Sequence, residues 1–398
     1  MTSSLSLTPG KKLGVGVIGA HAWAESAHLP GYAAYDRVDL VAICDSVPER
    51  AHRLAQMFGA RRVYTDYREM LQDPDIEMVD VCTPTDTHLP LSLAAIAAGK
   101  HVLSEKPLAH DAADAFMAAR KAREAGVRTK LGFTFRYSPA IRQVQRWIQD
   151  GTLGEIFHVH GLEQNSQFLD PQFPLRQVTA GADFNTLIPS SVVGYGSHLL
   201  DLVRWCVGEY SSVIGSMRNF VPERVVRGYG EGLQRIQVED GTVALAEFAS
   251  GAQGILQTSY IAIGNYPGVE LRVYGSKGAA VARLVEENGV AETLRFATPD
   301  QVEFRDVPLP DSAYPPGTTL HTPWPELYYR NLVRHFVDEI LDGTPEECTF
   351  YDGAKSQEVV NAIVQSNTER RWVDLPLYPE EMHLEETQAA EASAISTP

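Results

Sequence analysis

The sequence predicts an N-terminal doubly wound α/β domain with a parallel sheet, followed by an α+β domain with a large, mostly antiparallel open sheet. Three observations lead to this prediction. The chain has 398 residues, which is more than one hydrophobic core usually supports. Up to about residue 134, short apolar runs alternate with helical patterns. Beyond that point, strand signals follow one another, several of them at hairpin spacing.

Residues 12–134 form the predicted first domain. Its apolar runs are nearly continuous, as in parallel strands that are covered on both faces, and they span 13–18, 38–44, 78–82, 101–103 and 129–133. Helix signals lie between the runs. Ser46 and Glu49 have the spacing of a capping box, and Gly59 ends the helix that follows. A second helix is expected over 88–98, and Asp111 caps a third that ends at Gly126.

Residues 135–378 form the predicted second domain. Ser138-Pro139 opens a helix with an apolar face, and two further helices are expected over 326–341 and 352–368. Strand signals between them span 155–161, 235–239, 243–248, 254–261 and 269–274. The turns Asp240-Gly241 and Ser250-Gly251 separate three of these runs, which favours an antiparallel meander. The segment 275–278 resembles a phosphate loop only superficially and is interpreted as a hairpin turn.

The charge balance excludes several classes of partner. The chain carries 51 acidic and 34 basic residues, a net charge of −17. This disfavours nucleic acids and anionic membranes, which both require clustered basic residues. No apolar stretch approaches the ~20 residues of a membrane helix, and residues 1–10 lack the apolar core of a secretory signal. We therefore expect a cytoplasmic protein with disordered tails at 1–11 and 379–398, the second of them acidic.

No metal site is predicted. The four cysteines are scattered, and no close pair suggests zinc or a redox dithiol. Cys44 and Cys82 lie in apolar runs and are expected to be buried. His158 and His160 lie on the same side of a predicted strand, but no third ligand stands at a motif spacing.

The first strand leads into a turn that is typical of dinucleotide-binding Rossmann folds. Gly19, Ala20, His21, Trp23 and Ala24 belong to this turn and are the predicted phosphate contacts. Gly19 and Ala24 fit the pattern G-x-G-x-x-A, whereas His21 replaces the middle glycine. In such folds the free N–H groups of the following helix face the pyrophosphate. A strand-turn-helix unit that binds no nucleotide is the alternative interpretation.

Asp45 follows the second strand, where a carboxylate can bind the ribose hydroxyls of the adenosine half. Because it would repel a 2′-phosphate, Asp45 favours NAD over NADP. Arg50 could bind such a phosphate and weakens this preference. Ser46 is predicted to cap the next helix and to lie beside the same ribose.

Two further segments resemble the Gfo/Idh/MocA oxidoreductase family. One is Thr83-Pro84 followed by His88, and the other is the run Ala-Gly-Lys-His-Val-Leu-Ser-Glu-Lys-Pro-Leu-Ala over 98–109. The likeness continues through 132–133, 136, 138–139, 154–156 and the helical segments 352–353 and 369–372, so it spans nearly the whole chain except the tails.

The resemblance implies roles for residues of both segments. Lys106 corresponds to the lysine that reaches both the nicotinamide ribose and the reacting hydroxyl. A cation suits that place, because an alcohol develops alkoxide character as its hydride leaves. Thr83, Pro84, His88 and Glu105 are then expected to contact the cofactor. A surface lysine before a proline turn is the alternative for Lys106.

A third family motif matches residues 194–201 in part. His198 and Asp201 align with it, while Gly194 stands where the family has an aspartate. His198 is the candidate general base, since a neutral imidazole can accept the hydroxyl proton near pH 7. Asp201 would orient His198 or bind a substrate hydroxyl. The alternative for His198 is a structural histidine on a helix.

Four more residues are assigned to the substrate pocket: Arg136, Gln164, Asn165 and Tyr195. Family members commonly pair through the open face of the C-terminal sheet. The resemblance therefore also implies a homodimer or homotetramer.

These observations predict an NAD- or NADP-dependent oxidoreductase that acts on a sugar, polyol or glycoside-like substrate. The alternative is a non-catalytic sensor that binds the dinucleotide. Trp23-Ala24 and the segment 196–201 resemble the family branch that includes the galactose-pathway repressor, and Gly194 removes a polar group from the site. No DNA-binding element is visible in the sequence.

Overall fold

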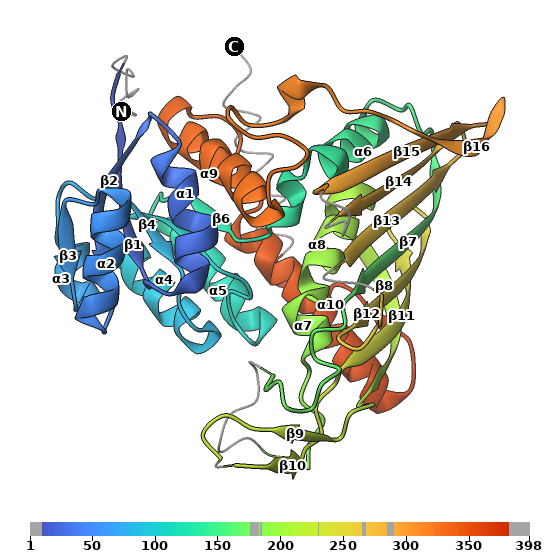
Figure 1. Cartoon of the computed structure of the whole chain (residues 1–398). Helices are drawn as coiled ribbons and strands as arrows, with labels where there is room; N and C mark the ends of the chain where they lie inside the picture. The colour runs from blue at the N-terminus through green and yellow to red at the C-terminus, as the bar shows by residue number, and fades with distance from the viewer. Residues whose placement is uncertain are drawn as a thin grey trace.

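The computed structural model describes residues 10–175, 183, 185–229, 231–264, 268–284 and 290–381. The predicted tails lie outside these residues except for 10–11 and 379–381. Two sheets with their helices lie side by side, the smaller one built by the N-terminal part of the chain and the larger one by the C-terminal part (Figure 1).

The N-terminal sheet has six parallel strands in the order β3-β2-β1-β4-β5-β6. This is the strand order of a dinucleotide-binding Rossmann fold. The strands are β1 (Leu13–Ile18), β2 (Val38–Cys44), β3 (Arg62–Tyr64), β4 (Met78–Val81), β5 (His101–Ser104) and β6 (Thr129–Leu131). The predicted doubly wound α/β domain is confirmed. Strand β3 was not predicted, because three residues with one exposed position carry too little pattern.

The helices of this part are η1 (Ala24–His28), α1 (Leu29–Ala33), α2 (Pro48–Phe58), α3 (Tyr67–Leu71), η2 (Thr85–Thr87), α4 (His88–Ala97) and α5 (Ala112–Glu124). Asp111 caps α5 as predicted and accepts a hydrogen bond from the Ala113 N–H, and Gly59 ends α2 in the left-handed conformation. The capping box at Ser46 is wrong. The N-cap of α2 is Val47, whose N–H is bound by the Asp45 carboxylate at 2.8 Å.

Among the described residues, nine strands form the C-terminal sheet, in the order β16-β15-β14-β13-β7-β12-β11-β8-β17. Their bounds are β7 (Ile156–Gln164), β8 (Tyr210–Arg218), β11 (Gly241–Phe248), β12 (Gln253–Ser259), β13 (Gly268–Gly275), β14 (Ala279–Leu284), β15 (Glu292–Thr298), β16 (Gln301–Asp306) and β17 (Val373–Asp374). The sheet is mostly antiparallel, as predicted, but β7 pairs with β12 in parallel.

Two details of the predicted meander are wrong. The run 235–239 is not a strand of this sheet, since β10 (Leu233–Arg235) pairs only with β9 (Glu223–Val225), and Val238 forms an isolated bridge. Asp240-Gly241 is not a hairpin turn either, because Gly241 begins β11. The turn at Ser250-Gly251 does join β11 to β12, and 275–278 joins β13 to β14.

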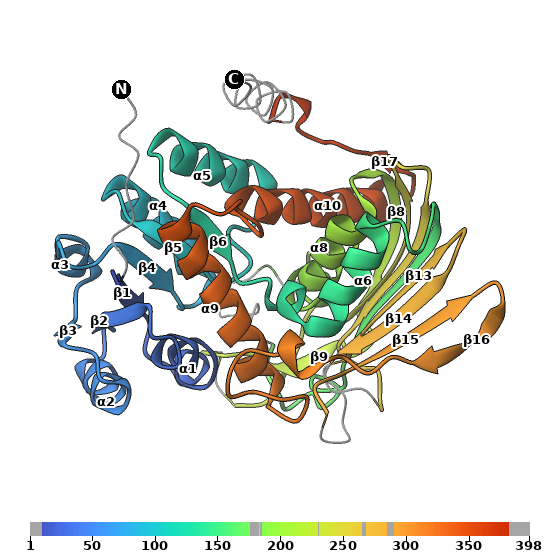
Figure 2. The same ribbon diagram turned by 90° about the horizontal axis from the view of Figure 1, so that it is seen from above.

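One face of the large sheet is covered by helices and the other is open (Figure 2). The helices of this part are η3 (Thr134–Tyr137), α6 (Pro139–Gln149), α7 (Ser191–Gly194), α8 (Gly196–Val207), η4 (Asp311–Ala313), α9 (Trp324–Asp342) and α10 (Phe350–Glu369). Strand β11 shows the alternation that results, with Ala244 and Ala246 buried while Val243 and Leu245 are exposed. This alternation decides which strand residues face α8.

Helix α9 belongs to the second half of the sequence but packs against the Rossmann part, next to α1 (Figures 1 and 2). Leu332, Val333, Phe336 and Val337 join the N-terminal hydrophobic core. The core of the first domain therefore includes residues far beyond 134. No helix in the described part of the chain is long and apolar enough to cross a membrane.

Candidate active site

The turn after β1 requires glycine at position 19. Gly19 has φ of +104°, and a Cβ there would lie 1.8 Å from the carbonyl oxygen of Cys82. Its N–H donates to the Cys44 carbonyl at 2.8 Å. The turn thus fits tightly between the ends of β2 and β4, where this fold binds its dinucleotide.

His21 supports this turn in place of a second glycine. Its Nδ1 accepts a hydrogen bond from the Trp23 N–H at 3.2 Å. Burial lowers the pKa of His21, so the ring is neutral at pH 7. The chain then continues as a π-helical turn, η1, in which Ala24 is buried.

Asp45 is fixed beside the same turn. One carboxylate oxygen accepts from the Ala20 N–H and the other from the Val47 N–H, both at 2.8 Å. Each oxygen keeps a further lone pair for a ribose hydroxyl. Ser46 and Arg50 are exposed on the neighbouring surface.

Glu105 occupies the centre of a buried polar cluster. It accepts hydrogen bonds from Trp23 Nε1 at 3.2 Å, from the Tyr329 hydroxyl and from the Lys106 N–H at 3.1 Å. His28 Nε2 lies 3.2 Å away, and its Nδ1 lies 2.7 Å from Asp80.

Charge holds this cluster together. Burial lowers the pKa of His28, but the charge of Asp80 more than compensates and leaves that pKa well above its usual value. Burial raises the pKa of Glu105, while its hydrogen bond to His28 and the charges of His28 and Lys106 lower it overall. An imidazolium thus lies between two carboxylates. This arrangement fixes the backbone just before Lys106. The prediction from sequence does not assign His28, Asp80 or Tyr329 to the site.

His88 connects the two segments that carry the family resemblance. It is buried, and its ring nitrogens lie 2.7 Å from the Pro107 carbonyl and 2.8 Å from the Thr83 carbonyl. Thr83 is half-buried and Pro84 is exposed where β4 ends. The structure therefore gives His88 the role of holding Thr83 and the Lys106-Pro107 segment together.

Lys106 reaches across from the Rossmann part to α7. Its Nζ donates to the Gly194 carbonyl at 2.8 Å and lies 5.3 Å from the centre of the Tyr195 ring. The predicted residues Lys106 and Tyr195 are thus brought together. Gly194, which has no carboxylate, contributes its backbone oxygen instead.

His198 lies on α8 in apolar surroundings. Its side chain is buried against Phe135, with ring centres 4.4 Å apart, and near Phe133 at 5.7 Å. Burial and the nearby charge of Lys106 hold the pKa of His198 well below its usual value. Its Nδ1 has no hydrogen-bond partner among the described residues. A neutral ring with an open nitrogen is what a general base requires.

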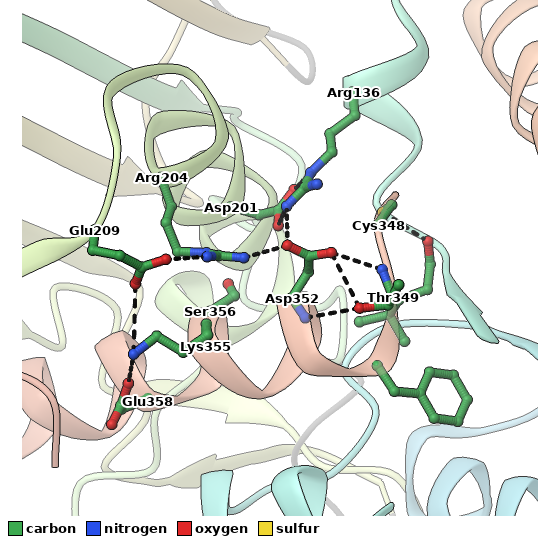
Figure 3. A network of polar contacts seen from close by, with 12 residues as sticks. Arg136, Asp201, Arg204, Glu209, Cys348, Thr349, Asp352, Lys355, Ser356 and Glu358 are labelled. Carbon is green, nitrogen blue, oxygen red and sulfur yellow. Dashed lines mark hydrogen bonds and ion pairs between the residues drawn. The ribbon is translucent and has the colours of Figure 1, made fainter. Parts of the chain in front are cut away.

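The predictions for Asp201 and Arg136 need correction. Both side chains are fully buried, and Arg136 donates to both Asp201 oxygens at 2.5 and 2.6 Å. Arg136 also contacts Asp352, which is bound by Arg204 (Figure 3). Both Asp201 oxygens are therefore occupied by Arg136, and Asp201 makes no hydrogen bond to His198 among the described residues. The pair fixes α8 to η3 and α10 instead.

The prediction for Gln164 is also wrong, and strand alternation explains why. Gln164 lies on the open face of the sheet, where it donates to Gln257 at 3.0 Å. Its neighbour Glu163 lies on the face toward α7 and α8, fully buried. Asn165, after the strand ends, is buried and lies 3.5 Å from Glu163 Oε1. Sequence reasoning missed Glu163, although its spacing from the buried Val159 and Gly161 is the signal that identifies its face.

Family models cover both parts of the chain. The model described as "Oxidoreductase family, NAD-binding Rossmann fold" matches residues 13–133, and the "GFO/IDH/MocA C-terminal domain" matches residues 141–281. The chain belongs to the Gfo/Idh/MocA oxidoreductase family. It is an NAD-binding enzyme of the dehydrogenase type.

Individual relatives are similar over nearly their whole length. Levoglucosan dehydrogenase from Pseudarthrobacter phenanthrenivorans is 28% identical over 92% of this chain and 99% of that protein. D-apiose dehydrogenase from Paraburkholderia graminis is 26% identical over 87% and 86%.

Solved structures give the same result. A levoglucosan dehydrogenase in complex with NADH and levoglucosan matches with a TM-score of 0.82 at 26% identity, over 92% of this chain and 100% of that one. An oxidoreductase domain protein from Kribbella flavida matches with a TM-score of 0.79 at 30% identity and the same coverage.

Proposed function

We propose that the protein transfers hydride reversibly between NAD and a hydroxyl-bearing carbon of a sugar, polyol or glycoside-like substrate. In this proposal Lys106 polarises the reacting hydroxyl and His198 accepts its proton. The observation that carries the proposal is that the two residues, from different parts of the chain, both lie at the start of α8. Lys106 Nζ donates to the Gly194 carbonyl at 2.8 Å, and the His198 N–H donates to the Tyr195 carbonyl at 3.0 Å. The charge of Lys106 accordingly lowers the pKa of His198.

The chain's own residues fit a dinucleotide. The close approach of Gly19 to Cys82 leaves no room for a side chain, and Asp45 lies where the adenosine ribose is expected. NAD, when bound, supplies the hydride acceptor. The cluster around Glu105 holds the backbone that presents Lys106.

The charge states of Lys106 and His198 determine their separate roles. The Lys106 ammonium stabilises negative charge on the substrate oxygen in a site with little water to screen it. His198, neutral and with its Nδ1 open, takes the hydroxyl proton. In the reductive direction the protonated ring returns that proton to the alkoxide.

The substrate class is supported by two kinds of evidence. The similar proteins named above are levoglucosan and D-apiose dehydrogenases. Half-buried aromatic rings also lie near the site: Trp23 and Trp324 have centres 5.8 Å apart, and Trp324 lies 5.5 Å from Phe135, which packs on His198. Such rings can cover the apolar face of a sugar, as in other largely aromatic ligand sites.

The alternative is a dinucleotide-binding regulator, which the missing carboxylate at Gly194 favours. The two functions differ in turnover. NAD is incubated with levoglucosan, inositols, aldoses and glycosides, and the absorbance of reduced nicotinamide is followed. We expect at least one member of this panel to be oxidised.

The Lys106→Met variant tests the assignment of Lys106. We expect kcat to fall by ~100- to 1000-fold, because a charge that acts on the transition state is lost. NAD binding, measured by calorimetry, should weaken by no more than about 10-fold, because only the contact of Lys106 with the nicotinamide ribose is lost. Lys121→Met, at an exposed position of α5, is the control and should keep full activity. Absence of turnover over the whole panel, with tight NAD binding, would favour the regulator.

A further inference from the structure

The positive charge of Lys106 lowers the pKa of three buried groups: Glu105, His198 and Glu163. Glu105 is satisfied by the hydrogen bonds described above. His198 has an assigned role in the proposed function. Glu163 has none, although it is fully buried close to the contact of Lys106 with α7. Thr258, which pairs with Glu163, has its hydroxyl 2.9 Å from Ser191 Oγ of α7, and Lys106 Nζ donates to the Gly194 carbonyl of the same helix.

Glu163 lies on the covered face of the large sheet. It is on β7, paired with Thr258 of β12 on one side and Val269 of β13 on the other. Two residues earlier, Gly161 packs so closely under Leu199 of α8 that a Cβ would lie 2.9 Å from it. Glu163 therefore lies on the strand that supports the helix of His198.

The fold leaves Glu163 poorly satisfied. Its Oε1 has one long contact, 3.5 Å from Asn165 Nδ2, and its Oε2 has no hydrogen-bond partner among the described residues. A buried polar atom without a partner lowers the stability of the folded protein. Such groups are a minority in folded proteins, and a ligand is one of the explanations for them.

Glu239 provides an internal comparison, because it is a second buried carboxyl group nearby. It accepts from the backbone N–H groups of Ser190 and Val192 and from the hydroxyls of Ser191 and Thr242. Glu239 thus organises the start of α7 and has a structural task. Glu163 has no comparable set of donors.

Burial gives Glu163 a distinct chemical state. It raises the pKa of Glu163 well above its usual value, against the opposing influences of Asn165 and Lys106. A carboxylic acid that stays protonated offers both a hydroxyl donor and a carbonyl acceptor. This combination suits a hydroxyl group, which also donates and accepts.

We propose that Glu163 recognises the substrate by hydrogen-bonding to the hydroxyl next to the one that Lys106 polarises. The proposal rests on the proposed function and narrows its substrate class to compounds with two neighbouring hydroxyl groups. Glu163 makes this contact as a neutral acid, and the contact supplies the partner that Oε2 lacks within the protein.

Kinetics of three variants test this role. Glu163→Leu should raise KM about 10-fold with little change in kcat, since one hydrogen bond of ordinary strength is lost. Glu163→Gln, which also donates and accepts, should stay within about threefold of the wild type. Glu303→Gln, at an exposed position of the edge strand β16, is the control and should match the wild type. NAD affinity verifies that each variant is folded.

Deoxy substrates make the test specific. The probes are levoglucosan, myo-inositol and the monodeoxy analogues of whichever is oxidised. For the analogue that lacks the neighbouring hydroxyl, the wild type and Glu163→Leu should have the same KM. The proposal would be overturned if Glu163→Leu raised KM equally for every analogue. It would also be overturned if the variant had the same KM as the wild type for the parent compound.

Infrared spectroscopy separates this proposal from the proposed function, because it requires no turnover. The wild type at pH 7 should show a protonated carboxyl C=O band that is missing in Glu163→Gln and that shifts when the sugar is added with NADH. A shift without turnover supports Glu163 while the catalytic proposal fails. Turnover with an unshifted band, or with no such band, refutes the role of Glu163 and leaves the dehydrogenase intact.

Discussion

At the scale of single residues, the site depends on groups that the fold keeps in unusual states. His198 is buried between aromatic rings and near a cation, and both influences favour its neutral form. Gly19 has a left-handed backbone and lies in contact with a carbonyl group. Each state can be tested with one substitution.

The pH profile tests His198. A base is active when it is unprotonated, so kcat/KM for alcohol oxidation should fall as the pH drops through the pKa of His198. Because burial and Lys106 lower that pKa, the fall should lie below pH 6.5. His198→Gln should lose this acid limb and about 100- to 10,000-fold in rate. His52→Gln, exposed on α2, is the control, and an unchanged acid limb in His198→Gln would contradict the assignment.

Gly19→Ala tests the turn after β1. The added Cβ would overlap the Cys82 carbonyl, so we expect loss of NAD binding and a lower melting temperature. Gly59→Ala is the matched control, since Gly59 also has a positive φ, but nothing lies within 4 Å of its Cβ position. It should lose only ~1–2 kcal/mol of stability and keep NAD binding. Similar effects of both substitutions would show that backbone strain alone matters at Gly19.

At the scale of elements, side chains from distant segments fix where helices begin. Ser138 caps α6 by accepting from the Ile141 N–H at 3.2 Å. Glu292 of β15 accepts from the Ala140 N–H at 3.1 Å and from the Tyr328 hydroxyl of α9 at 3.3 Å. One buried carboxyl group thus joins β15, α6 and α9.

Glu292 predicts a pH dependence of stability. Burial raises its pKa from 4.5 to about 7, so between these values the folded state holds a proton that the unfolded state has released. Stability therefore falls as the pH rises through this window, by up to about 3 kcal/mol. Glu292→Gln keeps an acceptor for Ala140 and should make this slope smaller by the contribution of Glu292, as measured by urea unfolding at pH 5 and pH 8. An equal slope in both proteins would contradict the explanation.

Local signals predicted the elements that they determine. The strands β1 and β2, the caps Asp111 and Ser138 and the stop at Gly59 follow from apolar runs and cap chemistry within a few residues. The assignment of α9 to the first core and the parallel pairing of β7 with β12 depend on contacts between distant segments. No local pattern contains that information.

The site residues also fall into two groups, those that the local sequence identifies and those that it does not. The motif residues Lys106, His198 and Gly19 could be found because their flanking sequence is distinctive. The pairing of Arg136 with Asp201 could not, since it joins residues 65 positions apart. The prediction for Gln164 rests on its place just after the predicted strand 155–161, whereas strand alternation turns Glu163 to the covered face.

At the scale of the whole molecule, the open face of the large sheet is the feature without a partner in a single chain. Val243, Leu245 and Ile255 are 46–50% exposed on its strands β11 and β12, and Leu245 pairs directly with Ile255. Contiguous apolar groups of this kind mark interfaces more often than isolated ones do. The homodimer or homotetramer that the sequence predicts would cover this face.

Leu245→Glu tests this assembly. We expect the wild type to have the mass of a dimer or tetramer by light scattering and the variant to have the mass of one chain, because a carboxylate buried at the interface would have no partner. Val302→Glu is the control. Val302 is 81% exposed on the edge strand β16, away from this group, so its substitution should leave the mass unchanged. A monomeric wild type, or a Leu245→Glu variant that keeps the assembled mass, would place the interface elsewhere.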